Sequence, residues 1–275
     1  MLPGMVTHAN SATRAGFPAC APSGEGFGPR SSGGRGTDPA RQICGLVIFF
    51  GGACLAGILA GIASACGHRR GDRAYWQGVA AGLLNTWRVI ADRLGILHFD
   101  PGAAAHFTEA RGTIFVSNHP SLMDGLMLAA TIPRAVCVMR DGLGSHPAFA
   151  TIARLAGYLP SSGGAALVRA GMRSLARGEN LIIFPEGTRS RSDKPGPFKA
   201  GFALIAKGSG APVQCLHARF EGAYFRKGRS LLSRAEFPVR LRFSAGPRME
   251  LRPGESAKAF ARRVEREFHP AGDAD

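Results

Sequence analysis

The sequence of 275 residues is poor in acidic side chains, with 19 Asp and Glu against 34 Lys and Arg and a formal net charge of +15. This imbalance indicates an anionic partner, which can be nucleic acid, an acidic membrane surface or a phosphate-bearing substrate. No recognised nucleic-acid-binding motif is present, so we expect no nucleic-acid partner. A G-x-S-x-G motif is also missing, which excludes a serine hydrolase built on a nucleophile elbow.

The six cysteines form no C-x-x-C pair, and no other cluster of metal ligands stands out in the sequence. This argues against zinc or thiol redox chemistry, and we expect neither a metal nor a bound cofactor. Three of the cysteines lie in or at the edge of one apolar segment. Their placement is typical of buried or lipid-facing free thiols in a reducing compartment.

Residues 1–42 have no apolar periodicity and are rich in Gly, Ser, Pro and Ala. Such a composition cannot bury enough surface to offset the entropy of ordering, so we predict a disordered N-terminal segment.

An uncharged apolar run of 24 residues follows, from Ile43 to Cys66. At 1.5 Å of rise per residue it is long enough to cross a bilayer, so we predict a transmembrane helix over 43–66. Arg69, Arg70 and Arg73 crowd its end, which favours the C-terminal side as cytoplasmic. The alternatives are a cleaved signal peptide, which would need a shorter lead-in, and a lipoprotein cleavage site at Ala63–Cys66.

The segment from Tyr75 to Leu94 carries apolar residues at steps of three and four, including Trp76 and Trp87. This pattern predicts an amphipathic helix. Its apolar face can lie on the bilayer surface or pack onto the core of the following domain.

Beyond residue 95, strand-like and helix-like segments alternate. This predicts an α/β domain over about 75–270, with a largely parallel sheet flanked by helices. The expected strands are 113–117, 135–139, 181–184, 212–216 and 238–244, and the expected helices are 120–131, 146–156, 164–177, 199–208 and 255–268.

The stretch "VSNHPSLMD" places His119 directly after an expected strand, with Pro120 suited to the first position of a helix. In α/β folds the carboxyl ends of the strands are where substrates bind. From a position just outside the helix, the ring of His119 can fold back over the first turn and meet Asp124. The carboxylate would then hold one ring N–H and leave the other nitrogen free as a base, which suits direct deprotonation of a hydroxyl.

A second motif, "FPEGTRS", again follows a strand and carries Glu186, Gly187 and Arg189. The glycine lets backbone N–H groups approach an oxyanion, and the arginine offers a forked donor that matches phosphate. A salt-bridged turn at the sheet edge would have the same composition.

Together, "NHPSLMD" and "FPEGTRS" resemble the first and third motif blocks of the glycerolipid acyltransferase family, which contains the 1-acyl-sn-glycerol-3-phosphate acyltransferases. The resemblance runs from about Thr113 to Arg219 and includes "FKAG" and Pro212 of "APVQCL". It implies that His119 is the general base and Asp124 its orienting partner. It also implies a substrate-binding set made of Asn118, Glu186, Gly187, Thr188, Arg189 and Lys199.

The resemblance further implies an enzyme that moves an acyl chain from a thioester of coenzyme A or acyl carrier protein to a lipid hydroxyl. A lysophospholipid such as 1-acyl-glycerol 3-phosphate is the first expected acceptor. We expect the protein at the inner (cytoplasmic) membrane, with a single-pass anchor and the catalytic domain on the cytoplasmic face, in contact with membrane lipids.

The chain departs from the family in the second block, which usually ends in an arginine that grips the acceptor phosphate. The corresponding region here is "GYLPSSGG", Gly157–Gly164, which has no arginine. Arg169, Arg189 or Lys199 can substitute for it, or the acceptor carries no phosphate, as in the assembly of lipid-linked pigments. A catalytically inactive, lipid-binding membrane protein is the further alternative.

Overall fold

The computed structural model describes residues 36–190 and 195–269. Residues 1–35, most of the segment predicted to be disordered, lie outside this part. Residues 36–42 belong instead to a short strand and to the start of the first helix.

A seven-stranded sheet forms the centre of the fold, in the order β2-β9-β7-β3-β6-β4-β5. Neighbouring strands are parallel except for the pair β7 and β9. The strands are β2 (Leu97–Asp100), β3 (Ile114–Ser117), β4 (Ala135–Met139), β5 (Leu159–Pro160), β6 (Asn180–Ile183), β7 (Val213–Glu221) and β9 (Val239–Met249). The short strands β1 (Gly36–Thr37) and β8 (Glu236–Phe237) pair separately.

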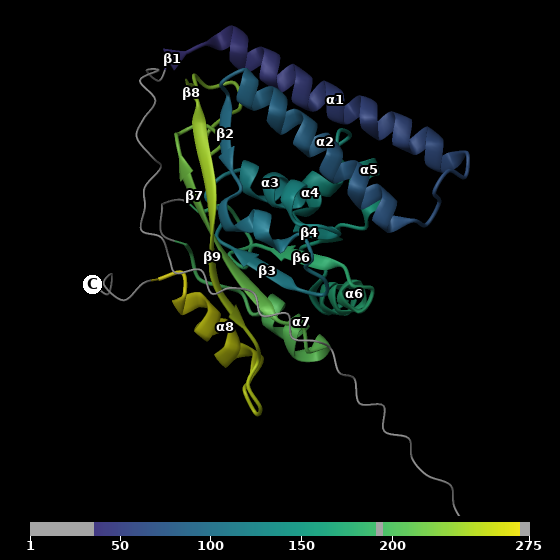
Figure 1. Ribbon diagram of the computed structural model, residues 1–275, viewed down its shortest axis with the longest axis vertical. Helices are drawn as coiled ribbons and strands as arrows, with labels where there is room; N and C mark the ends of the chain where they lie inside the picture. Colours follow the sequence, from purple (N-terminus) through teal and green to yellow (C-terminus); the bar gives the residue numbers. More distant parts are fainter. Residues whose placement is uncertain (1–35, 191–194, 270–275) are drawn as a thin grey trace, which may run out of the picture.

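Helices cover both faces of the sheet (Figure 1). The face toward the N-terminal helices carries α1 (Pro39–Ala65), α2 (Arg73–Arg93), the 3-10 helix η1 (Gly102–Phe107), α3 (Met123–Thr131), α4 (Asp141–Gly144) and α5 (Ala150–Ala156). The other face carries α6 (Gly164–Ala176), α7 (Gly201–Ser209) and α8 (Ala257–Arg266). The predicted α/β architecture with a largely parallel sheet is therefore confirmed.

Helix α1 is the one described helix that is long and apolar enough to cross a membrane. It begins at Pro39, four residues before the predicted start, because Asp38 caps it: the side chain accepts a hydrogen bond from the Arg41 N–H at 3.0 Å. Proline suits the first helical position, where its missing N–H costs nothing. The earlier start lengthens the helix to 27 residues.

One side of α1 packs on the domain along most of its length, beside α2 (Figure 1). Near its start Gly45 lies against Ile96, and farther along Phe49 packs edge-on against Trp87 at 4.9 Å. Near its end Gly57 and Gly61 approach Thr151 of α5. The opposite side exposes large apolar residues: Ile43, Val47, Leu55, Ile58, Leu59 and Ile62. Helix α1 therefore belongs to the same core as the sheet.

Helix α3 begins three residues later than predicted, at Met123 rather than Pro120. The reason is a local hydrogen-bond set, in which the Ser121 hydroxyl accepts from the Met123 N–H and the Asp124 carboxylate accepts from the Ser121 N–H. These bonds have the reciprocal pattern of a capping box, placed one residue before the N-cap Leu122, which has no side-chain cap of its own. His119 lies in a loop, four residues before the helix, rather than at the helix cap.

Candidate functional site

The site is built at the carboxyl edge of two neighbouring parallel strands. His119 follows β3, and the 184–190 turn follows β6, which pairs with β3 through Val116 and Ile183. Because both strands end at the same edge, the two motifs, 67 residues apart, meet in space.

His119 and Asp124 are in direct contact, with Nδ1 of the ring 3.0 Å from Oδ2 of the carboxylate. Asp124 is fully buried and also accepts from the Ser121 N–H at 2.8 Å and from the Ser121 hydroxyl at 2.5 Å. Because Oδ2 is the acceptor in this contact, we assign the ring proton of His119 to Nδ1. The Nε2 atom is then the free, basic nitrogen of a side chain that is 19% exposed.

The imidazole is fixed from its face as well as from its edge. The ring of Phe184 stacks on His119 with centroids 4.1 Å apart and planes at 21°. Gly125, next to Asp124, makes room for this stack, since a Cβ there would lie 3.3 Å from the Phe184 ring. Together these contacts hold the base in one orientation, as general-base catalysis requires.

Glu186 joins the two motifs. Its carboxylate is buried and accepts from the His119 N–H at 3.0 Å, from the Gly196 N–H at 2.9 Å and from the Ser190 hydroxyl. In return, the Ser190 N–H donates to the His119 carbonyl at 2.8 Å. Both backbone groups of His119 are therefore held by the second motif, and Glu186 acts on the site by fixing the backbone of the base.

Arg189 is half-buried and directed across the site toward the chain after β7. Its Nη1 donates to the carbonyls of Phe225 at 3.1 Å and Arg226 at 3.3 Å. The pKa of Arg189 is lowered, first by burial and then by the positive charge of Arg140, while Asp124 opposes the shift. Arg140 is exposed directly after β4 and has no ion-pair partner among the described residues. Both arginines add positive charge to this side of the site, which Asp124 offsets in part, and such charge favours an anionic group.

The other predicted site residues are placed differently. The Asn118 amide is engaged at both ends by the backbone of Ala218, at 2.8 and 2.7 Å, so it ties the loop to β7. Gly187 has φ +70 and donates its N–H to the Phe184 carbonyl, which closes the turn. The Lys199 side chain lies against this glycine, where a Cβ would meet its Nζ at 2.8 Å. Thr188 is exposed, with no hydrogen-bond partner among the described residues.

Three residues of the site were not predicted: Ser121, Arg140 and Phe184. The S-x-x-D spacing of Ser121 and Asp124 is a capping-box pattern that the sequence does carry. Arg140 directly follows the predicted strand 135–139, so its place at the sheet edge could have been inferred. Arg169, a candidate substitute for the missing arginine, is exposed on α6 and contacts none of the described residues of the site.

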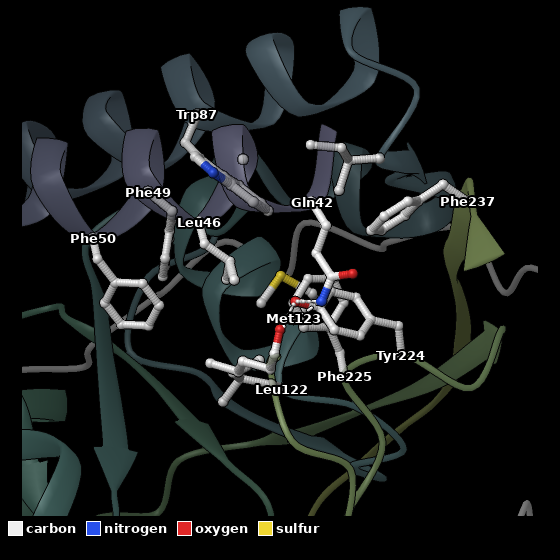
Figure 2. Close-up of a pocket in the computed structure, with 13 residues that line it drawn as sticks. Gln42, Leu46, Phe49, Phe50, Trp87, Leu122, Met123, Tyr224, Phe225 and Phe237 are labelled. Atoms are coloured by element: carbon white, nitrogen blue, oxygen red, sulfur yellow. Dashed lines mark hydrogen bonds between the residues drawn. The ribbon is translucent and has the colours of Figure 1, made fainter. Parts of the chain in front are cut away.

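An apolar pocket adjoins the site (Figure 2). Leu122 and Met123, both within four residues of His119, form part of its wall. The rest comes from α1, α2, the residue before β2, and the chain between β7 and β9: Gln42, Gly45, Leu46, Phe49, Phe50, Trp87, Ile96, Tyr224, Phe225, Leu231 and Phe237. Gln42, the Tyr224 hydroxyl and the Trp87 indole N–H are the polar side-chain groups in this mainly apolar lining, so the pocket suits a hydrocarbon group.

Comparison with known proteins finds a family model that matches part of the chain. Residues 102–217 match the family model described as Acyltransferase. A 1-acyl-sn-glycerol-3-phosphate acyltransferase of Cocos nucifera is 30% identical over 116 residues, 40% of this chain and 37% of that protein. One of Helicobacter pylori (strain J99) is 33% identical over 101 residues, 34% of this chain and 43% of that protein. The matches thus span less than half of these relatives.

A solved structure shares the fold. It is the crystal structure of the 1-acyl-sn-glycerophosphate acyltransferase PlsC from Thermotoga maritima, with a TM-score of 0.55 and 20% sequence identity. The similarity covers 84% of this chain and 91% of that one. It therefore extends well beyond the segment matched by sequence.

Proposed function

We propose that the protein is a member of the glycerolipid acyltransferase family and moves an acyl chain from a thioester to a hydroxyl of a lipid acceptor. The match of residues 102–217 to the Acyltransferase family model supports this proposal. The observation that carries the proposal is the contact of His119 with buried Asp124 at 3.0 Å, held by the second motif at the sheet edge. The acyl donor is a thioester of coenzyme A or acyl carrier protein, and the first acceptor to consider is 1-acyl-glycerol 3-phosphate.

In the proposed reaction, Nε2 of His119 takes the proton of the acceptor hydroxyl as its oxygen attacks the thioester carbonyl. The Asp124 carboxylate, in contact with Nδ1, stabilises the imidazolium that forms. The new C–O bond forms, the C–S bond breaks, and the proton passes from His119 to the departing thiolate or to solvent. His119 thereby returns to its starting state.

The positive charges of Arg189 and Arg140 support an acceptor with an anionic head group. Nη1 of Arg189 donates to two backbone carbonyls, whereas Nε and Nη2 have no hydrogen-bond partner among the described residues. The forked geometry of a guanidinium suits a phosphate. Arg140 thereby supplies the charge that "GYLPSSGG" lacks. An acceptor without phosphate is the alternative, and it would leave this pair of charges without a function.

The apolar pocket next to His119 is the proposed site for the hydrocarbon part of a substrate. Its wall includes α1, whose outer side exposes large apolar residues. Because α1 packs on the domain over most of its length, we propose that it lies along the membrane and immerses its outer side, rather than crossing alone. Substrate could then reach the site from the lipid. The arginines at positions 69 and 70 are exposed beside α1 and support the cytoplasmic face, which carries acidic lipids.

Transfer from a labelled acyl thioester tests this proposal. The acceptors are 1-acyl-glycerol 3-phosphate and its neutral counterpart, monoacylglycerol. Wild type should acylate the phosphate-bearing acceptor. Arg189→Ala and Arg140→Ala should each raise its KM about tenfold or more, as expected for a lost charge-assisted contact.

Arg173→Ala, which removes an exposed arginine of α6 outside the site, is the matched control and should leave KM unchanged. Two results would contradict a phosphate-bearing acceptor: equal wild-type activity on both acceptors, or a KM that is unchanged in both Arg189→Ala and Arg140→Ala. No transfer to any acceptor would favour an inactive lipid-binding protein.

A further inference from the structure

Gln42 is a buried polar residue in the first turns of the largely apolar helix α1. It is 8% exposed, and its Nε2 donates to the carbonyls of Leu231 at 2.7 Å and Ser233 at 2.9 Å. The Tyr224 hydroxyl lies 3.4 Å from the same nitrogen and itself donates to the Leu231 carbonyl at 2.6 Å. Burying an amide is unfavourable unless it is hydrogen-bonded, so these contacts determine where α1 docks.

The residues that Gln42 holds belong to the chain between β7 and β8, here called the 222–233 segment. This segment also contacts both motifs of the site. The carbonyl of Phe225 accepts from the Leu122 N–H at 2.9 Å and from Nη1 of Arg189 at 3.1 Å. Arg189 is therefore held by the same segment that binds the start of α1.

Phe225 adopts a backbone conformation that needs support from its surroundings. Its φ is +67, in the left-handed region that a bulky residue rarely occupies. The strained residue is kept in place by its packing: it is 5% exposed, and its ring lies 4.1 Å from that of Tyr224. Because Gln42 and Leu231 hold the Tyr224 hydroxyl, loosening this contact would free Phe225 to relax and move its carbonyl.

We propose that Gln42 is a positioning residue, which acts through the 222–233 segment to hold the carbonyl groups that fix Arg189. In this arrangement the acceptor site is complete only while the start of α1 is docked. Docking of the apolar helix is thereby coupled to binding of the anionic head group. The inference rests on the proposed function in one respect, namely that Arg189 binds the acceptor.

Gln42→Leu tests the coupling, and Gln77→Leu is its matched control. Gln77 is also a buried glutamine on an N-terminal helix, 4% exposed, and its Nε2 donates to the Ala156 carbonyl at 3.2 Å and to Glu179 at 3.3 Å. These partners lie outside the 222–233 segment. Both variants remove a buried amide, so a general loss of packing affects both of them.

The first readout is kinetic and uses the full chain in phospholipid vesicles. Gln42→Leu should raise the KM for 1-acyl-glycerol 3-phosphate about two- to tenfold, the size of one or two lost hydrogen bonds, with the KM for the thioester unchanged. In an Arg189→Ala background the same change should add nothing, because the group it positions is gone. A rise that persists in that background, or one that Gln77→Leu reproduces, would overturn the proposal.

The second readout does not depend on activity. Amide hydrogen exchange of the peptide that contains Leu122 reports the hydrogen bond to the Phe225 carbonyl. Gln42→Leu should speed this exchange several-fold, and Gln77→Leu should not. Unchanged exchange in Gln42→Leu would overturn the link even if the kinetics agreed. If wild type acylates no acceptor, the proposed function fails and the exchange experiment alone decides the inference.

Discussion

Replacing Asp124 by asparagine should separate two functions of this carboxylate: it fixes the tautomer of His119, and it supplies a negative charge beside the ring. Oδ2 accepts from two N–H groups, those of Ser121 and of the His119 ring, whereas Oδ1 accepts from the Ser121 hydroxyl. An N–H group can only donate a hydrogen bond, whereas a hydroxyl group can either donate or accept one. The asparagine oxygen will therefore take the Oδ2 position, and its NH2 group will face the Ser121 hydroxyl. The tautomer of His119 survives, and the negative charge is lost.

The size of the effect follows from that charge. Two unit charges about 4 Å apart interact by about 4 kcal/mol at an effective dielectric constant of about 20. Because His119 is partly exposed, we take about 2 to 4 kcal/mol. The imidazolium exists only once the hydroxyl proton has moved, so the loss falls on the transition state. We expect kcat to fall about thirty- to thousandfold with KM nearly unchanged.

Steady-state transfer from a labelled thioester measures this prediction, with thermal unfolding as the check on folding. Asp141→Asn, which changes an exposed aspartate at the start of α4, is the control and should behave as wild type. Asp124→Ala should lose more than Asp124→Asn, because the tautomer and a partner of the buried Ser121 N–H are lost too. A kcat within about threefold of wild type in Asp124→Asn, or a change confined to KM, would refute the reasoning.

Three further predictions concern stability and reactivity. Glu186→Gln should lower Tm by about 3–10 °C in thermal unfolding. Each carboxylate oxygen accepts from a backbone N–H group, so the NH2 group of glutamine must face one of these two donors in either orientation. An unchanged Tm would contradict this account. Burial raises the pKa of the Cys137 and Cys215 thiols to about 12. Mass spectrometry after maleimide treatment at pH 8 should therefore find both unlabelled until the protein unfolds, whereas exposed Cys66 should be labelled. Labelling of both buried thiols in the folded state would contradict this prediction. The hydrogen bond from Arg263 lowers the pKa of Glu255 from 4.5 to about 2, so the stabilisation is complete above pH 4.5 and is lost as pH falls toward 2. The Tm difference between wild type and Glu255→Gln should shrink over that window, and a difference independent of pH would argue against the pair.

The elements that surround the site were predictable from the sequence because their signals are local. The mainly apolar segments 114–117 and 180–183 form buried central strands, and both are followed by the residues that carry the chemistry. Strands β2 and β5 were not predicted. One contains the polar pattern "LHFD" and the other has two residues, so each depends on pairing with β9 or β4 rather than on its own composition.

The contacts that determine the arrangement of the site could not be predicted from the sequence, because they join segments that are distant along the chain. Nothing near Gln42 in the sequence indicates that it binds a segment about 190 residues away. The start of α3 was misplaced because the Ser121 and Asp124 cap prevailed over the preference of Pro120 for a first helical position. The resemblance places Glu186 in the substrate-binding set, and the structure adds contacts that the sequence did not indicate, with the backbone of His119 and the hydroxyl of Ser190.

Single-turnover acyl transfer by His119→Ala, beside wild type, tests the central proposal most directly. The backbone of His119 is held by Glu186 and Ser190 whatever its side chain, so the variant should fold with a Tm close to that of wild type. We predict that the rate of transfer falls at least about hundredfold, while thioester and acceptor still bind. Transfer at the wild-type rate by the folded variant would contradict the assignment of His119 as the general base.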